Sequence, residues 1–182
     1  MALTLITFEG RTPVVDPSAF VAPGARLIGD IEIGPDSSIW YNCVLRGDVN
    51  RIRIGARTNI QDGSVIHVDS PRAGDKDGFA TIIGDDVLIG HLAMVHGCIL
   101  HDRAFVGLGS IVMDGCAIES DAMLAAGAML TPGKTIPSGQ LWAGRPARYV
   151  RDLSEAELEG QRLGVAHYVE LAKRHAAAIA GG

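Results

Sequence analysis

Three histidines stand at spacings that could place them around one metal ion. His67 and His96 each follow an aliphatic residue, Ile66 and Val95, and His91 precedes His96 by five positions. Three neutral imidazoles suit zinc or another late first-row divalent ion, and they leave one coordination position open, which is typical of a catalytic site. Such a metal lowers the pKa of its bound water to about 7 and makes hydroxide available at neutral pH. The remaining histidines lack this phasing and are interpreted as structural or solvated: His101, His167 and His175.

A six-residue aliphatic repeat predicts the elements that position these histidines. Aliphatic residues recur at steps of six in four runs: Val15 to Leu45, Ile54 to Ile66, Ile83 to Val95 and Leu100 to Ile136. Six residues accommodate a short strand and a corner, but not a helix. Three such steps make a triangular coil of about 18 residues, and successive coils stack with parallel strands about 4.8 Å apart. The sequence therefore predicts a parallel β-helix, and periodicity alone leaves its hand open.

The repeat also sets the register of the histidines. His67 and His96 are 29 residues apart; one coil accounts for about 18, and the remaining 11 or so match a polar loop that follows Ile66. We therefore expect the two histidines at equivalent positions on neighbouring coils, with backbones roughly 5 Å apart. His91 belongs to the preceding six-residue step, so it lies on another face or at a corner. A triangular prism packs naturally as a three-fold oligomer, in which a neighbouring chain could supply its own His91 to the pair.

The predicted domain organisation is a single unit. The β-helix is expected over residues 1–150, with a loop ejected at about 69–80, and residues 151–182 contribute a C-terminal helix of the same domain. Ser154 and Glu157 have the spacing of a capping box, in which the first residue caps the helix and the glutamate follows three positions later. Apolar residues with helical spacing follow, so we expect a helix from about 155 to 177 along the outside of the coil. The fold class is all-β with this added helix.

Composition limits the partners and the compartment. The chain has 182 residues, 20% of them charged, with a formal net charge of -5, which gives no basic footprint for nucleic acid or for an anionic membrane. Three cysteines without a CxxC pair predict reduced thiols rather than a disulfide framework. The first ten residues carry no targeting signal and no long apolar run, so the expected location is cytoplasmic.

Three stretches of the chain resemble the γ-class carbonic anhydrases. They are Leu45–Asp48 (LRGD), Asn59–His67 (NIQDGSVIH) and Ile89–Cys98 (IGHLAMVHGC). The similarity extends over nearly the whole chain, including the C-terminal helix. It implies a left-handed β-helix, a homotrimer, and one zinc ion at each subunit interface, with iron or cobalt as alternatives, bound by His67, His91 and His96. The implied activity is the reversible hydration of CO2 to bicarbonate by metal-bound hydroxide.

The same resemblance implies roles for further residues. The candidate catalytic residues are Arg46, Asp48, Asn59, Gln61, Asp62 and Tyr168. Arg46 and Asp48 look like the pair that links neighbouring subunits beside the site. Gln61 and Asp62 look like residues that orient the hydroxide and the substrate, with Asn59 in the same stretch. Tyr168, on the final helix, resembles a tyrosine near the metal.

Two departures from the family pattern keep other functions open. Val49 stands where well-characterised members have a glutamate after the Arg-Gly-Asp sequence, and the polar loop has aspartates but no glutamate. Those glutamates move protons from the site to solvent, so this chain is expected to be a slow carbonic anhydrase. One alternative is acyl transfer or thioester hydrolysis on coenzyme A substrates, which would use a histidine as base and need no metal. The other is a non-catalytic scaffold that keeps a metal for trimer stability.

Overall fold

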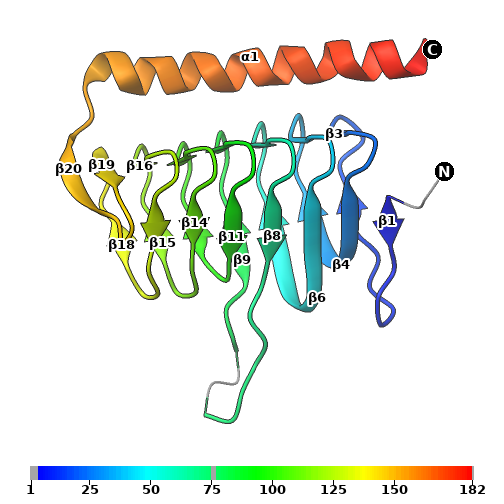
Figure 1. Cartoon of the computed structure of the whole chain (residues 1–182). Coiled ribbons are helices and arrows are strands. Elements are labelled where there is room, and N and C mark those ends of the chain that lie inside the picture. The colour runs from blue at the N-terminus through cyan, green and yellow to red at the C-terminus, as the bar shows by residue number, and fades with distance from the viewer. Residues whose placement is uncertain (1–3, 75–76, 182) are drawn as a thin grey trace.

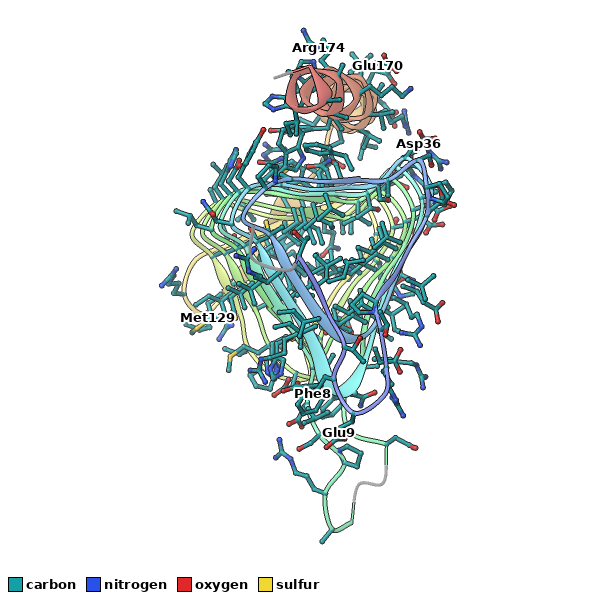
Figure 2. The ribbon with its side chains drawn as sticks, turned by 90° about the vertical axis from the view of Figure 1, so that its right-hand side faces the viewer. Phe8, Glu9, Asp36, Met129, Glu170 and Arg174 are labelled. Atoms are coloured by element: carbon teal, nitrogen blue, oxygen red, sulfur yellow. The ribbon has the colours of Figure 1, made fainter. Side chains whose placement is uncertain are left out.

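The aliphatic repeat folds into a β-solenoid of stacked coils with one helix along its side (Figure 1). The computed structural model describes residues 4–74 and 77–181. Along the solenoid axis, the coils have the triangular outline that a six-residue repeat predicts (Figure 2). In the described part of the chain, no helix is long and apolar enough to cross a membrane.

The strands are short, and most contain two or three residues. In chain order the described residues form β1 (Leu5–Ile6), β2 (Val14–Val15), β3 (Phe20–Val21), β4 (Arg26–Ile33), β5 (Ser38–Ile39), β6 (Val44–Ile54), β7 (Asn59–Ile60), β8 (Val65–His67), β9 (Thr81–Ile83), β10 (Leu88–Ile89), β11 (Met94–His96), β12 (Ile99–Leu100), β13 (Phe105–Val106), β14 (Ile111–Val112), β15 (Ala117–Ile118), β16 (Met123–Leu124), β17 (Met129–Leu130), β18 (Thr135–Ile136), β19 (Gln140–Ala143) and β20 (Arg148–Asp152). Strands of successive coils pair in parallel, and β19 and β20 close the end of the solenoid as an antiparallel pair. β20 crosses the boundary predicted at residue 150.

The repeated aliphatic residues stack in ladders that fill the interior. On one face Ile60 pairs with Ile89, Ile89 with Val106, and Val106 with Leu124. Each of these side chains is 0% exposed. Each buried aliphatic side chain contributes roughly 1.5–3 kcal/mol relative to an exposed one, so the ladders hold the coils in fixed register. That register determines which side chains meet on the outside.

The aliphatic repeat lengthens to a step of nine residues between Leu45 and Ile54, a stretch that forms one continuous strand. β6 runs through it and pairs with β4, and the pairing shifts register at a bulge between Gly29 and Ile31. β4 and β6 are long enough to take part in two faces of the solenoid. Asp48 lies in this stretch, directly after Gly47, the last paired residue before the register shift.

The predicted loop leaves the solenoid between β8 and β9 and projects away from it (Figure 1). Its base is closed by Asp69 and Phe79, whose backbone N–H groups donate to each other's carbonyl oxygens at 2.9 and 3.3 Å. Asp75, one of the loop aspartates noted in the sequence, lies outside the described residues. The loop begins directly after β8, the strand that carries His67.

The C-terminal helix α1 (Glu155–Ala180) lies along the face built from β3, β5, β7 and β10 (Figure 1). Ser154 and Glu157 form the predicted capping box, with both reciprocal hydrogen bonds present. The helix continues three residues beyond the predicted end at 177, because its last turns are rich in alanine, the strongest helix former. His175, interpreted as structural or solvated, is structural: its Nδ1 lies 2.8 Å from the Tyr41 hydroxyl, and its ring packs against Trp40.

Candidate metal centre

The strands β8 and β11 bring His67 and His96 together as the register predicts. The two residues are direct partners in the parallel pairing of these strands. His67 Nδ1 lies 3.0 Å from His96 Nε2, and the ring centroids are 5.0 Å apart. The predicted proximity of the two histidines is therefore confirmed.

Two carboxylates contact the outer nitrogens of this histidine pair. His67 Nε2 donates to Asp48 Oδ1 at 3.0 Å, and His96 Nδ1 donates to Asp114 Oδ1 at 2.5 Å. Because a carboxylate is an acceptor, the outer nitrogen of each ring is the donor in these contacts, and the two inner nitrogens face each other at 3.0 Å. A cation could be coordinated by both inner nitrogens at once. Carboxylate–histidine pairs of this kind also orient metal ligands, so the residues present fit a metal ion.

Hydrogen bonds from neighbouring side chains stabilise the charged form of the Asp48 carboxylate. Burial would raise the pKa of Asp48, but hydrogen bonds from His67 and Arg46 outweigh it and keep the pKa below its ordinary value. Burial also lowers the pKa of His67, which favours the neutral ring that a metal requires. The Arg46–Asp48 ion pair forms within one chain at 2.5 Å. Its predicted link between subunits stays a prediction.

His91 lies apart from the other two histidines. It follows β10 at a corner, with its side chain 40% exposed, and its Nδ1 lies 2.8 Å from Asp62 Oδ2. Within residues 4–74 and 77–181, no three histidine, cysteine or acidic side chains converge on one metal position. One chain therefore carries a pair of candidate ligands at one place and a single candidate ligand at another.

The remaining predicted site residues gather on the His91 side. Gln61 is buried and donates from Nε2 to Asn59 Oδ1 at 3.0 Å. Asp62 accepts from the backbone N–H of Tyr41 at 3.2 Å in addition to its contact with His91. Burial raises the pKa of Tyr168, with a smaller contribution from the charge of Asp62, and its ring packs against Trp40 with the ring centroids 5.6 Å apart.

The candidate site residues of one chain therefore form two separate groups, which are called half-sites. The first half-site contains His67 and His96 with their carboxylates and Arg46. The second half-site contains His91, Asp62, Gln61 and Asn59.

Exposed apolar side chains surround the half-sites. Leu92, beside His91, is 72% exposed, and Met94, two residues before His96, is 39% exposed. Val49 and Leu108 are also exposed, at 44% and 51%. Apolar surface that gathers around polar residues in this way is typical of a protein–protein contact.

Asp114 contacts His96 but is not among the site residues predicted from the sequence. Asp114 follows β14, the strand that pairs with β11 one coil further on. A step of one coil from His96 leads to this stretch, so the repeat carried the signal. Whether the side chain reaches back to His96 depends on the shape of the corner, which periodicity does not describe.

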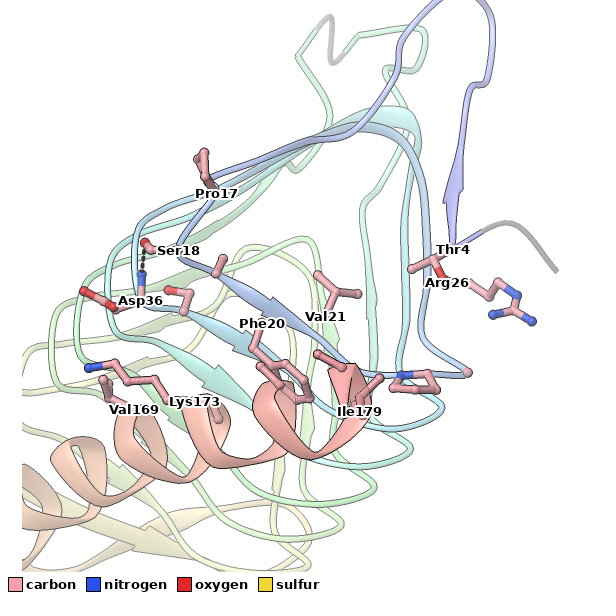
Figure 3. Close-up of a pocket in the computed structure, with 17 residues that line it drawn as sticks. Thr4, Pro17, Ser18, Phe20, Val21, Arg26, Asp36, Val169, Lys173 and Ile179 are labelled. Atoms are coloured by element: carbon pink, nitrogen blue, oxygen red, sulfur yellow. Dashed lines mark hydrogen bonds between the residues drawn. The ribbon is translucent and has the colours of Figure 1, made fainter. Parts of the chain in front are cut away.

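The cavity shown in Figure 3 lies away from the candidate metal centre. This cavity, about 600 Å³ in volume, lies between the last turns of α1 and the first coils, with Phe20 and Val169 among its lining residues. None of the predicted site residues lines it. A smaller cavity of about 280 Å³ adjoins the histidine pair, with Met94, His96 and Asp114 among its lining residues.

The fold and the histidine pair define a class of protein, the left-handed β-helix proteins with hexapeptide repeats. The solved structure of a hexapeptide transferase family protein from Anaplasma phagocytophilum is 46% identical and matches with a TM-score of 0.88 over 95% of this chain and 98% of that one. A Bacillus cereus protein named as an acetyltransferase is 35% identical, with a TM-score of 0.89 over 94% and 95% of the two chains. No protein-family model matches the chain.

Curated relatives identify the family within that class. The chain is 47% identical to the mitochondrial γ carbonic anhydrase 1 of Arabidopsis thaliana over 96% of this chain and 63% of that protein. It is 46% identical to the mitochondrial γ carbonic anhydrase 3 of the same plant, over 95% and 67% of the two chains. This chain therefore belongs to the γ-carbonic anhydrase family, and it spans a little under two thirds of the first of these relatives.

Proposed function

We propose that this chain is a metal-dependent carbonic anhydrase that interconverts CO2 and bicarbonate at the subunit interfaces of a homotrimer. The observation that carries the proposal is the facing pair of His67 Nδ1 and His96 Nε2, each ring bound at its other nitrogen by a carboxylate. His67 and His96 of one subunit and the partner subunit's His91 would hold zinc, with ferrous iron or cobalt as alternatives. When bound, the metal acts as a Lewis acid and makes hydroxide available at neutral pH.

The chain's own residues orient the reactants in this proposal. Asp48 and Asp62 hold the imidazoles of His67 and His91 through their outer nitrogens. Asn59 accepts from Gln61 Nε2 and so fixes the amide of Gln61, which positions the nucleophile and CO2 together with Asp62. For Tyr168, whose ring packs against Trp40, a place near the metal is proposed from the family resemblance.

Proton export is the step that this chain supports least. Val49 has no group that carries a proton, and Asp69 at the base of the loop is paired with Arg72 at 2.5 Å. Hydration releases one proton per turnover, and that proton must reach the buffer. We therefore propose a slow enzyme whose turnover rises with the concentration of an added buffer base.

The shared site leads to a complementation experiment. A chain with His67 and His96 replaced by alanine keeps only the second half-site, and a chain with His91→Ala keeps only the first. In a mixed cyclic trimer, one of the three interfaces contains all three histidines. We expect doubly tagged mixed trimers to regain about one third of the wild-type metal content and CO2 hydration rate.

Each variant trimer alone is the control and is expected to be inactive. Mixed trimers that form but regain neither metal nor activity would contradict a site shared between subunits. The metal content of each variant trimer alone would then show whether its missing histidines are needed for metal binding.

The names of the solved structures favour one second candidate, acyl transfer on a coenzyme A thioester. This chemistry would use a histidine as base without a metal, so a chelator would leave it intact. A cytoplasmic location remains a proposal from the sequence, and the curated Arabidopsis relatives are named as mitochondrial.

A further inference from the structure

The carboxylate of Asp114 contacts the outer ring nitrogen of His96. Its Oδ1 accepts from His96 Nδ1 at 2.5 Å, and both side chains are 30% exposed. Asp48 also accepts a hydrogen bond from Arg46, and Asp62 accepts one from the backbone N–H of Tyr41. His67, His91 and His96 thus each have one aspartate on a ring nitrogen.

Gly97 makes the approach of Asp114 to His96 possible. Its φ of +51° is in the left-handed region, and a Cβ at this position would overlap the Asp114 carboxylate and lie 2.8 Å from the Phe79 Cβ. The backbone N–H of Gly115 donates to the Gly97 carbonyl at 2.8 Å, which fixes the corner that carries Asp114. The absence of a side chain at Gly97 therefore leaves space for the Asp114 carboxylate beside His96.

We propose that Asp114 is a positioning residue for His96. By accepting the Nδ1 proton, it holds the ring in the tautomer whose Nε2 lone pair faces His67. The link to a metal rests on the proposed function, whereas the tautomer is a property of the metal-free chain. Without the carboxylate the proton is free to occupy Nε2, and the ring is free to turn.

The test compares two ways of removing the same contact. Asp114→Ala deletes the carboxylate, and Gly97→Ala keeps it but displaces it. We expect each variant to bind Co²⁺ about 10- to 100-fold more weakly in competition with a chromogenic chelator. Asp114→Asn keeps an acceptor for the Nδ1 proton, so a smaller loss is expected.

The control is Asp121→Ala. Asp121 has similar exposure, 23%, and accepts from Arg103 at 2.8 and 2.9 Å, at a corner without a candidate ligand. This variant is expected to keep wild-type Co²⁺ affinity. If the loss of any surface aspartate weakened Co²⁺ binding, Asp114→Ala and Asp121→Ala would lose affinity to the same extent.

A second readout needs no metal. Nitrogen-15 shifts of the histidine rings are expected to report the Nδ1–H tautomer of His96 in the wild type and its loss in Asp114→Ala. Wild-type Co²⁺ affinity and an unchanged tautomer in Asp114→Ala would overturn the assignment of Asp114. In another outcome, the wild-type trimer binds no Co²⁺, whereas Asp114→Ala still loses the Nδ1–H tautomer of His96. That outcome would support the role of Asp114 and contradict the proposed metal centre.

Discussion

Replacing His96 with alanine is expected to reduce the metal content of the purified protein to near zero. The facing pair would lose one of its two nitrogens, and the carboxylate of Asp114 would lose its donor. Metal catalysis supplies several kcal/mol of transition-state stabilisation, so the rate of CO2 hydration should fall by about 10³-fold or more. Because the metal would join two subunits, the trimer should also dissociate at a higher protein concentration.

Metal analysis, hydration rate and sedimentation measure these effects on the same sample. The matched control is His101→Ala, which removes an exposed histidine whose Nε2 lies 3.7 Å from Glu119. This control should retain its metal and its activity. A metal-to-chain ratio in His96→Ala equal to that of the wild type would overturn the assignment of His96 as a ligand.

The second large effect is expected in the core. Leu124 is 0% exposed and lies between Val106 and Trp142 in one ladder. Leu124→Ala would remove buried carbon atoms from a stack that cannot collapse without breaking register, so it should lower the free energy of unfolding by about 2–5 kcal/mol. Denaturant unfolding at a fixed protein concentration measures the loss, because the stability of an oligomer depends on concentration.

The same substitution on the surface of α1 provides the comparison. Leu163 is 63% exposed, and alanine is as good a helix former as leucine, so Leu163→Ala should change the free energy of unfolding by about 0.5 kcal/mol or less. Equal losses in the two variants would contradict the view that the aliphatic ladders hold the coils together.

The sequence predicts the coils and the neighbouring positions of His67 and His96 because both follow from a period. Parallel strands with a repeating aliphatic residue can pair in few registers, since a one-residue slip would turn the buried side chains outward. A break in the period places the loop after Ile66, and the capping box places the helix after Ser154. These features depend on buried area and local capping, which residue types record directly.

Other parts of the site depend on side-chain reach, which a period does not encode. Asp114 contacts His96 only because the corner at Gly97 is left-handed and has no side chain. The division of the residues into two half-sites likewise follows from which corner carries His91. The resemblance to a family supplied the candidate roles of Gln61 and Tyr168, and the structure adds that Gln61 donates to Asn59 and that Tyr168 packs against Trp40.

Stopped-flow CO2 hydration by the trimer, purified without oxygen and loaded with zinc or ferrous iron, tests the proposed activity itself. We expect hydration above background that disappears with a chelator, returns with added metal, and accelerates with buffer concentration. No hydration above background in a fully metallated trimer would contradict the proposed activity. Acyl-coenzyme A substrates and a scaffold role would then become the functions to test.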